Sequence, residues 1–240
     1  MIVPNFVPDQ LEVPGNVTEQ PYLVRIWFIR RVTWLFTLSV AVVGFVVWLD
    51  RLPRVGLLAS ILLLAVLLIG LELWRILTRG RRVEDIVSAC CLPLVLGCVA
   101  LVASEVHGVG YPVWQLLVGP TILLLYTTLC GRDYSFVGGF LLSLIGSAVT
   151  IASIGMSEGM SVRDEVIAQT SSVAFLFYIV YDLASLLSRR RLGEEAAAVT
   201  DLYRDIFNVF GYIVRVIRHW RRHHIWSMPT PLELKWKGKG

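Results

Sequence analysis

The chain has 240 residues, of which 56% are hydrophobic and only 17% charged, with a net charge of +4 from 22 Lys and Arg against 18 Asp and Glu. Its mean hydropathy is +0.68. A soluble domain carries about 25% charged residues, so this composition excludes a soluble enzyme, a disordered chain and a disulfide-stabilised secreted domain. The composition predicts a polytopic membrane protein.

The amino-terminal 24 residues hold four prolines and lack the basic-then-apolar start of a cleavable signal peptide. We therefore predict three parts: an irregular arm over 1–24, a transmembrane domain over 25–217 and a basic, aromatic tail over 218–240. The four cysteines have no C-x-x-C spacing and are interpreted as small buried residues rather than as a metal or redox site.

Six apolar segments are each long enough for a helix that crosses the about 30 Å hydrocarbon core. Every one should be helical, because lipid offers no partner for backbone polar groups. The fold class is therefore all-α, a polytopic membrane helix bundle of about seven transmembrane helices. The six segments are 32–49, 55–77, 86–104, 112–130, 136–155 and 166–187.

A seventh segment, 201–217, is more polar, since it contains Asp201, Arg204, Asp205 and Arg215. Charges exposed to lipid are costly, at about 2.5–3.5 kcal/mol each on insertion scales. Two structures fit this pattern, a span buried inside the bundle and an amphipathic helix at the surface.

Basic residues in the loops predict the orientation. Arginines cluster before the first span, between the second and third spans and after the sixth, whereas the loop over 104–111 has none. The positive-inside rule then places the amino terminus in the cytoplasm. The basic tail does not fit an odd number of spans, and the sequence leaves its side open.

Ionisable residues inside spans are the candidates for function, because hydrocarbon penalises them unless they face a partner or a cavity. They are Glu72, Arg75, Asp182 and Asp205. Glu72 and Arg75 are three residues apart on one helix face, within reach of an intrahelical salt bridge. This pair has either a structural or a functional role.

Asp182 lies near the end of the sixth span and Asp205 near the start of the seventh, so a helical hairpin brings them to a similar depth. Two carboxylates in a dry site share protons as a pair and form a weak site for a cation such as Ca²⁺. The alternative is local pairing of each aspartate with Arg189 or Arg204.

Three blocks give the sequence a likeness to a known family. They are FIRRVTWLFTLSVAVVGFVVWL, GRDYSFVGGFLL over Gly131–Leu142, and YDLASLLSRRRLGEEAAAVTDLYRDIFNVF over Tyr181–Phe210. In order and spacing the chain resembles the transmembrane Bax inhibitor motif family, the Bax-inhibitor-like membrane proteins.

The resemblance implies a seven-helix bundle with the last helix central, and a calcium leak governed by a di-aspartyl pH sensor. Asp182 and Asp205 match the sensor aspartates by motif position. The resemblance therefore implies that they form the pH sensor, the cation gate and a weak calcium site. Arg75, beside Glu72, is the candidate latch on the first aspartate.

We therefore expect a pH-sensitive calcium leak channel, shut when the pair is protonated or bridged to Arg75 and opened by deprotonation. The alternative function is a non-conducting scaffold that modulates other membrane proteins. The expected partners are the lipid bilayer and calcium or protons, with no nucleic acid and no cofactor beyond calcium as the permeant ion. We expect no enzymatic activity and a bacterial inner membrane as the location.

Overall fold

The computed structural model describes residues 13–78, 81–110, 113–131 and 134–205, and these ranges are entirely helical and loop, without strands. The seven α-helices are α1 (Tyr22–Trp48), α2 (Leu57–Leu77), α3 (Arg82–Gly108), α4 (Gln115–Leu129), α5 (Phe136–Glu158), α6 (Val162–Arg189) and α7 (Glu195–Asp205). The protein is thus an all-α helix bundle, as the sequence predicts.

Five helices, α1, α2, α3, α5 and α6, are long and apolar enough to cross a membrane. Four of them, α1, α3, α5 and α6, extend the predicted spans by up to ten residues, since polar first and last turns continue a helix that hydropathy alone would end. Helix α2 begins two residues later than predicted. For α1 the extension reaches back to Tyr22, three residues before the predicted domain boundary.

The fourth predicted span is shorter than expected. Helix α4 has 15 residues, or about 22 Å at 1.5 Å per residue. It begins at Gln115 instead of residue 112, because Val113 and Trp114 form the turn that leads into it.

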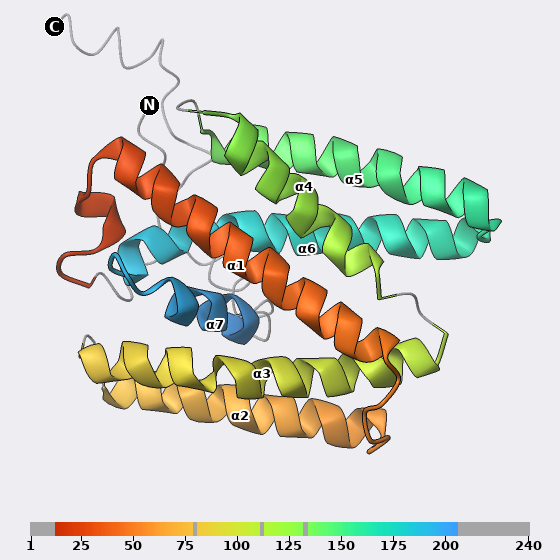
Figure 1. The fold of residues 1–240 in the computed structure, drawn as a ribbon, viewed down its shortest axis with the longest axis horizontal. Helices are drawn as coiled ribbons and strands as arrows, with labels where there is room; N and C mark the ends of the chain where they lie inside the picture. Colours follow the sequence, from red (N-terminus) through yellow and green to blue (C-terminus); the bar gives the residue numbers. More distant parts are fainter. Residues whose placement is uncertain (1–12, 79–80, 111–112, 132–133, 206–240) are drawn as a thin grey trace, which may run out of the picture. The chain divides into compact units, whose positions relative to one another are not determined.

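The helices pack in two groups, with α1 and α7 between them (Figure 1). Helix α4 packs against α5 and α6, and α2 packs against α3. Helix α1 contacts α3, α4 and α7, while α7 contacts α1, α2, α3 and α6. The described part of α7 is therefore the central helix of this arrangement.

Hydroxyl groups fix α7 to three of its neighbours. Tyr203 and Ser39 on α1 share a hydrogen bond of 2.7 Å between their hydroxyl oxygens. Thr200 donates to the carbonyl of Ser88 on α3 at 2.8 Å, and Tyr178 on α6 donates to the carbonyl of Leu202. Such buried hydrogen bonds give a polar helix a defined position inside an apolar bundle.

The described part of the amino-terminal arm is ordered against the end of α6. Val13 and Val17 donate their backbone N–H groups to the carbonyls of Ser188 and Arg190. Val17 is fully buried at the start of a one-turn 3₁₀-helix, Val17–Glu19. The remainder of the predicted arm (1–12), the carboxyl-terminal part of the predicted seventh span and the tail over 218–240 lie outside the described residues.

Candidate functional site

Polar side chains converge on one face in the last two turns of α6. Asp182 is fully buried, and its Oδ1 accepts a hydrogen bond from the Ser185 hydroxyl at 2.9 Å. Arg189 follows seven residues later, about two turns further along the same face. Its Nη2 lies 2.5 Å from the same oxygen of Asp182 and also contacts the Ser185 hydroxyl.

The guanidinium of Arg189 also holds Asp205, the last described residue of α7. Its Nη1 donates to Asp205 Oδ2 at 2.6 Å. Both aspartates and the arginine are at least nine-tenths buried. Because a guanidinium is only a few ångströms across, the two carboxyl groups lie well within about 10 Å of each other, the Debye length at ordinary salt. The charge state of one carboxyl group therefore affects the protonation of the other.

A second arginine, Arg190, connects the end of α6 to both α7 and α3. It binds Asp201 through two hydrogen bonds of 2.6 and 2.7 Å and Glu84 through two of 2.9 and 3.0 Å. A fifth reaches Asp85 at 2.5 Å. Burial by itself would lower the pKa of the Arg190 guanidinium, but the carboxylates of Asp201 and Glu84 outweigh it and raise the pKa above its ordinary value. Arg190 is therefore a permanently charged link.

Arg204 joins these contacts to α2. It lies 2.5 Å from Asp201 on its own helix, 2.9 Å from Glu72 on α2 and 3.8 Å from Asp205. Arg75 on α2 completes the set at 3.9 Å from Asp201. Helix α7 is thus joined through ion pairs to α2, α3 and α6.

These contacts form one continuous cluster, which we call the ion-pair network. It comprises six carboxylates and four guanidinium groups, those of Glu72, Glu84, Asp85, Asp182, Asp201, Asp205, Arg75, Arg189, Arg190 and Arg204. Among the described residues its carboxylates outnumber its guanidinium groups by two, and Arg191 and Glu194 at its edge add one charge of each sign. An excess of buried carboxylates favours the uptake of protons or of a cation.

The structure brings Asp182 and Asp205 together on Arg189, one of the local partners expected from spacing. Glu72 and Arg75, expected to pair within α2 if their role is structural, pair across to α7 instead, Glu72 with Arg204 and Arg75 with Asp201. Helix α7 lies alongside α2 and offers both a cation and a carboxylate, so each side chain finds its partner there.

Among the described residues, no group of three or more His, Cys, Asp or Glu is arranged to hold a metal ion. In this arrangement the carboxylates of Asp182 and Asp205 are held by a guanidinium, the charge that a calcium ion would otherwise supply. The four cysteines are free thiols.

Sequence reasoning missed Glu84, Asp85 and Arg190 as site residues. The two acids precede the predicted third span at 86–104, whereas α3 already begins at Arg82. Asp201 was noted only as an unusual charge and Arg204 only as a local partner for an aspartate, although with Asp205 they lie on one face of a helix. Three charges on one face of a buried helix are a signal for partners on the neighbouring helices.

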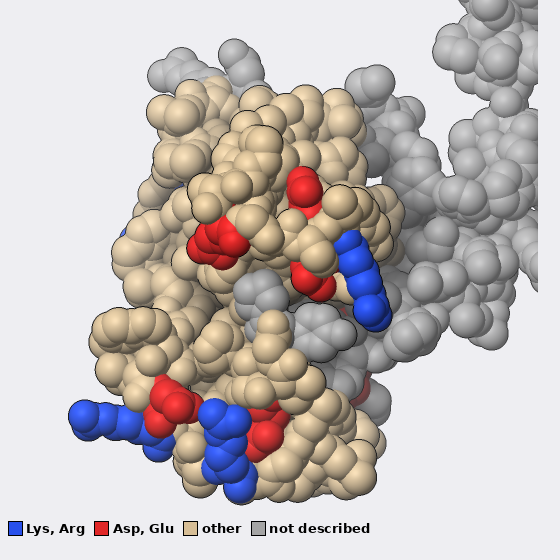
Figure 2. Space-filling view, turned by 90° about the vertical axis from the view of Figure 1, so that its right-hand side faces the viewer, with Lys and Arg blue, Asp and Glu red and all other residues tan. Residues whose placement is uncertain are grey.

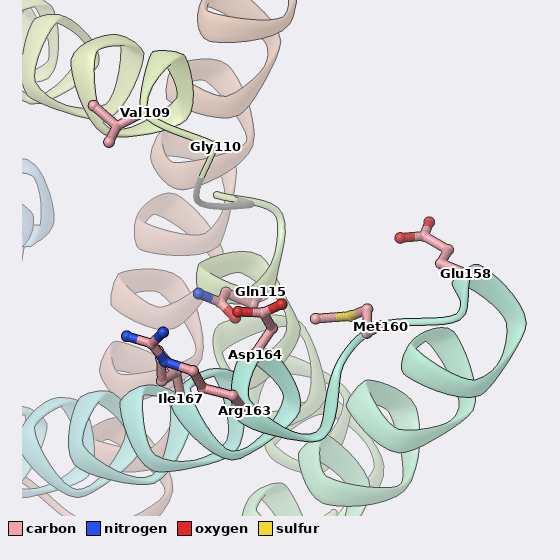
Figure 3. Close-up of a pocket in the computed structure, with 8 residues that line it drawn as sticks. All are labelled: Val109, Gly110, Gln115, Glu158, Met160, Arg163, Asp164 and Ile167. Atoms are coloured by element: carbon pink, nitrogen blue, oxygen red, sulfur yellow. The ribbon is translucent and has the colours of Figure 1, made fainter.

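A recess of about 470 Å³ lies near the other end of α6. Gln115, at the start of α4, and Asp164, in the first turn of α6, lie beside each other there, with Arg163 and Glu158 further apart (Figure 3). Gln115 is 9% exposed, and its Oε1 makes no hydrogen bond with the described residues. Figure 2 looks onto this end, where a few acidic and basic side chains stand among uncharged residues. Helix α6 has 28 residues, so the recess and Arg189 are separated by most of about 42 Å.

Known proteins of Arabidopsis thaliana are similar to part of this chain. Protein LIFEGUARD 3 is 28% identical over 143 residues, which cover 54% of this chain and 58% of that protein. A BI1-like protein is 34% identical over 89 residues, 37% of this chain and 35% of its own length. Protein LIFEGUARD 1 is 28% identical over 133 residues, 55% of this chain and 53% of its own.

These homologues are members of the Bax inhibitor-1 family. The chain spans between 35% and 58% of the length of these Bax-inhibitor-like relatives. No family model matches the chain, and no solved structure matches it. The Bax-inhibitor-like relationship and the apolar helices together indicate an integral membrane protein.

Proposed function

We propose that this protein is a pH-sensitive leak channel for calcium or a similar cation, gated by Asp182, Arg189 and Asp205. The observation that supports this most is that one buried guanidinium holds both aspartates at the contact between α6 and α7. Homology to Bax-inhibitor-like proteins supports it independently.

The gate works as a clamp. Arg189 attracts the two aspartates only while their carboxylates are ionised, because a protonated carboxyl has lost the charge that the guanidinium binds. A proton taken up by Asp205 therefore removes the ion pair that Arg189 makes across to α7, and a proton taken up by Asp182 removes the partner that orients Arg189 within α6. Acid loosens the clamp and alkali tightens it. This direction is opposite to the one expected from the sequence, where Arg75 was the candidate latch and deprotonation opened the pore.

Movement of α7 changes the centre of the bundle. Its ion pairs with Glu72 and Arg75 hold it to α2 in the described arrangement, and Asp201 is linked to Glu84 and Asp85 of α3 through Arg190. Once the clamp is released, the excess carboxylates provide the oxygen ligands that Ca²⁺ favours. The ion-pair network thus forms the gate in the closed state and part of the cation path in the open state. The pH sets the balance between these two states.

The recess at the other end of the bundle is the proposed mouth. Glu158 and Asp164 place two negative charges at its rim against the one positive charge of Arg163, and the buried oxygen of Gln115 provides a neutral ligand. Negative side chains at a mouth raise the local concentration of cations and so increase the rate of entry. With the amino terminus in the cytoplasm, this mouth faces away from the cytoplasm.

The experiment is calcium flux into liposomes that contain the purified protein, at pH 6 and at pH 8. Wild type should conduct more at pH 6. The Asp182→Asn and Asp205→Asn variants should conduct at pH 8 as wild type does at pH 6, since an amide cannot be clamped as a carboxylate. Asp50→Asn serves as the control, because Asp50 is exposed and pairs only at the surface with Arg54.

Background flux in every sample, with correctly folded protein, would contradict a channel and favour the non-conducting scaffold. Greater flux at pH 8 in wild type would retain a pH sensor but contradict the clamp.

A further inference from the structure

A groove between α1 and α4, on the side where α1 begins, belongs to no part of the proposed gate. It has a volume of about 430 Å³. Trp34, Leu35 and Leu124 form its apolar part. Trp34 is 53% exposed, whereas Leu35 and Leu124 are partly buried. The apolar wall thus runs from the surface of α1 toward α4.

Two arginines form the polar end of the groove. Arg30 is held by the end of α4, because its Nε and Nη2 donate to the carbonyls of Thr127 at 2.5 Å and Gly131 at 2.6 Å. The guanidinium of Arg31 lies 3.7 Å from the centre of the Trp27 ring. Its side chain remains 53% exposed. The guanidinium of Arg30, which is fixed by hydrogen bonds, and that of Arg31, which is half-exposed, therefore both lie at the edge of the apolar part of the groove.

The acidic lining does not neutralise this end. Glu195, the first residue of α7, lies 3.5 Å from Arg31. It is 8% exposed, and its Oε1 makes no hydrogen bond with the described residues. One carboxylate thus faces two guanidinium groups, and the groove keeps a net positive charge.

The groove lies at the end of a predicted membrane span, at the level expected for the lipid headgroups. Arg30 and Arg31 directly precede the apolar run that begins at residue 32. Trp27 and Trp34 are seven residues apart, about two turns on one face of α1. Tryptophan is enriched where a helix passes from lipid into water, and basic pockets between transmembrane helices bind anionic headgroups. At this depth we expect the groove to face the lipid headgroups.

We propose that the groove binds one anionic phospholipid. Its phosphate takes the exposed donors of Arg31 beside Arg30, and one acyl chain lies along Trp34 and Leu35. Phosphatidylcholine is bound more weakly, because its quaternary ammonium adds a positive charge that has no hydrogen to donate. This site is independent of whether the protein conducts ions.

Native mass spectrometry of the detergent-solubilised protein tests the proposal, with phosphatidylglycerol and phosphatidylcholine of identical chains added in turn. The first bound phosphatidylglycerol should bind roughly tenfold more tightly than phosphatidylcholine. Arg31→Gln should weaken it by about fivefold, the value expected for one basic residue at an anionic surface. Arg25→Gln is the matched control on the same helix, since Arg25 is turned to the backbone carbonyl of Gln20, and it should change the affinity less than twofold.

A second measurement locates the chain. Phosphatidylglycerol with brominated chains should quench tryptophan fluorescence more than brominated phosphatidylcholine does, and Trp34→Phe should remove that difference. Equal binding of the two lipids, an equal loss in Arg25→Gln and Arg31→Gln, or a lipid-free dimer whose interface covers Trp34 would overturn the proposal.

Discussion

Replacing Arg190 with methionine should destabilise the protein severely. The substitution keeps a long side chain but removes five hydrogen bonds, two to Asp201, two to Glu84 and one to Asp85. Breaking a buried ion pair by removing one partner costs about 3–5 kcal/mol, because the other charge stays buried. Asp201 keeps Arg204 at 2.5 Å, which places the expected loss at the lower end, about 3 kcal/mol.

The assay is thermal unfolding in detergent micelles at pH 8, followed by circular dichroism. At about 2–4 °C per kcal/mol for a chain of this size, Arg190→Met should lower Tm by about 10 °C. Arg191→Met is the matched control. Its side chain is 25% exposed and its ion pairs are 3.5 and 3.7 Å long, so it should cost less than about 1 kcal/mol.

A double variant separates the ion pair from the lost packing. Adding Glu84→Gln to Arg190→Met removes the stranded charge and should restore part of the lost stability. Equal melting temperatures for Arg190→Met and Arg191→Met would refute the reasoning, and so would a double variant less stable than Arg190→Met alone.

Three further predictions follow from the packing, the mouth and α2. Gly119→Ala should lower the free energy of unfolding by about 1–3 kcal/mol, because the new Cβ would lie 2.9 Å from the side chain of the fully buried Leu176. Gly97→Ala is the control and should be neutral in the same unfolding assay, since its new Cβ would have no atom within 4 Å. Equal effects of the two substitutions would contradict this packing. The double variant Glu158→Gln, Asp164→Asn should reduce calcium flux at low ionic strength and have little effect in high salt, where surface charges are screened. A loss of flux that does not depend on salt would contradict the role of the recess as the channel mouth. Glu72→Gln should raise flux at pH 8 by weakening the contact of α2 with Arg204, and unchanged flux would remove Glu72 from the gate.

The sequence predicts the helices well because lipid leaves the backbone no alternative to helix over a long apolar run. It places their ends less well, because hydropathy falls before a helix ends. The first turn of α3 shows the consequence. Glu84 and Asp85 are polar and so resemble a loop, yet they are helical and face Arg190.

The two aspartates were predictable from spacing, because a hairpin of α6 and α7 brings residues near its turn to one depth. Arg189 was a candidate partner for either aspartate, but that it holds both was not predictable. Arg189, Arg190 and Arg191 are consecutive, and sequence alone cannot decide which of them turns inward. In the structure Arg189 and Arg190 both turn inward, to different carboxylates, while Arg191 remains partly exposed. This difference depends on how α6 ends and on where α7 and α3 meet it.

The most direct test of the clamp is calcium flux at pH 8 through Arg189→Gln, which retains both aspartates and loses only the charge that joins them. We predict flux at pH 8 equal to that of wild type at pH 6, with Arg191→Gln unchanged. If Arg189→Gln, folded and reconstituted to the same density, conducts at pH 8 no more than wild type does, Arg189 does not hold the channel shut.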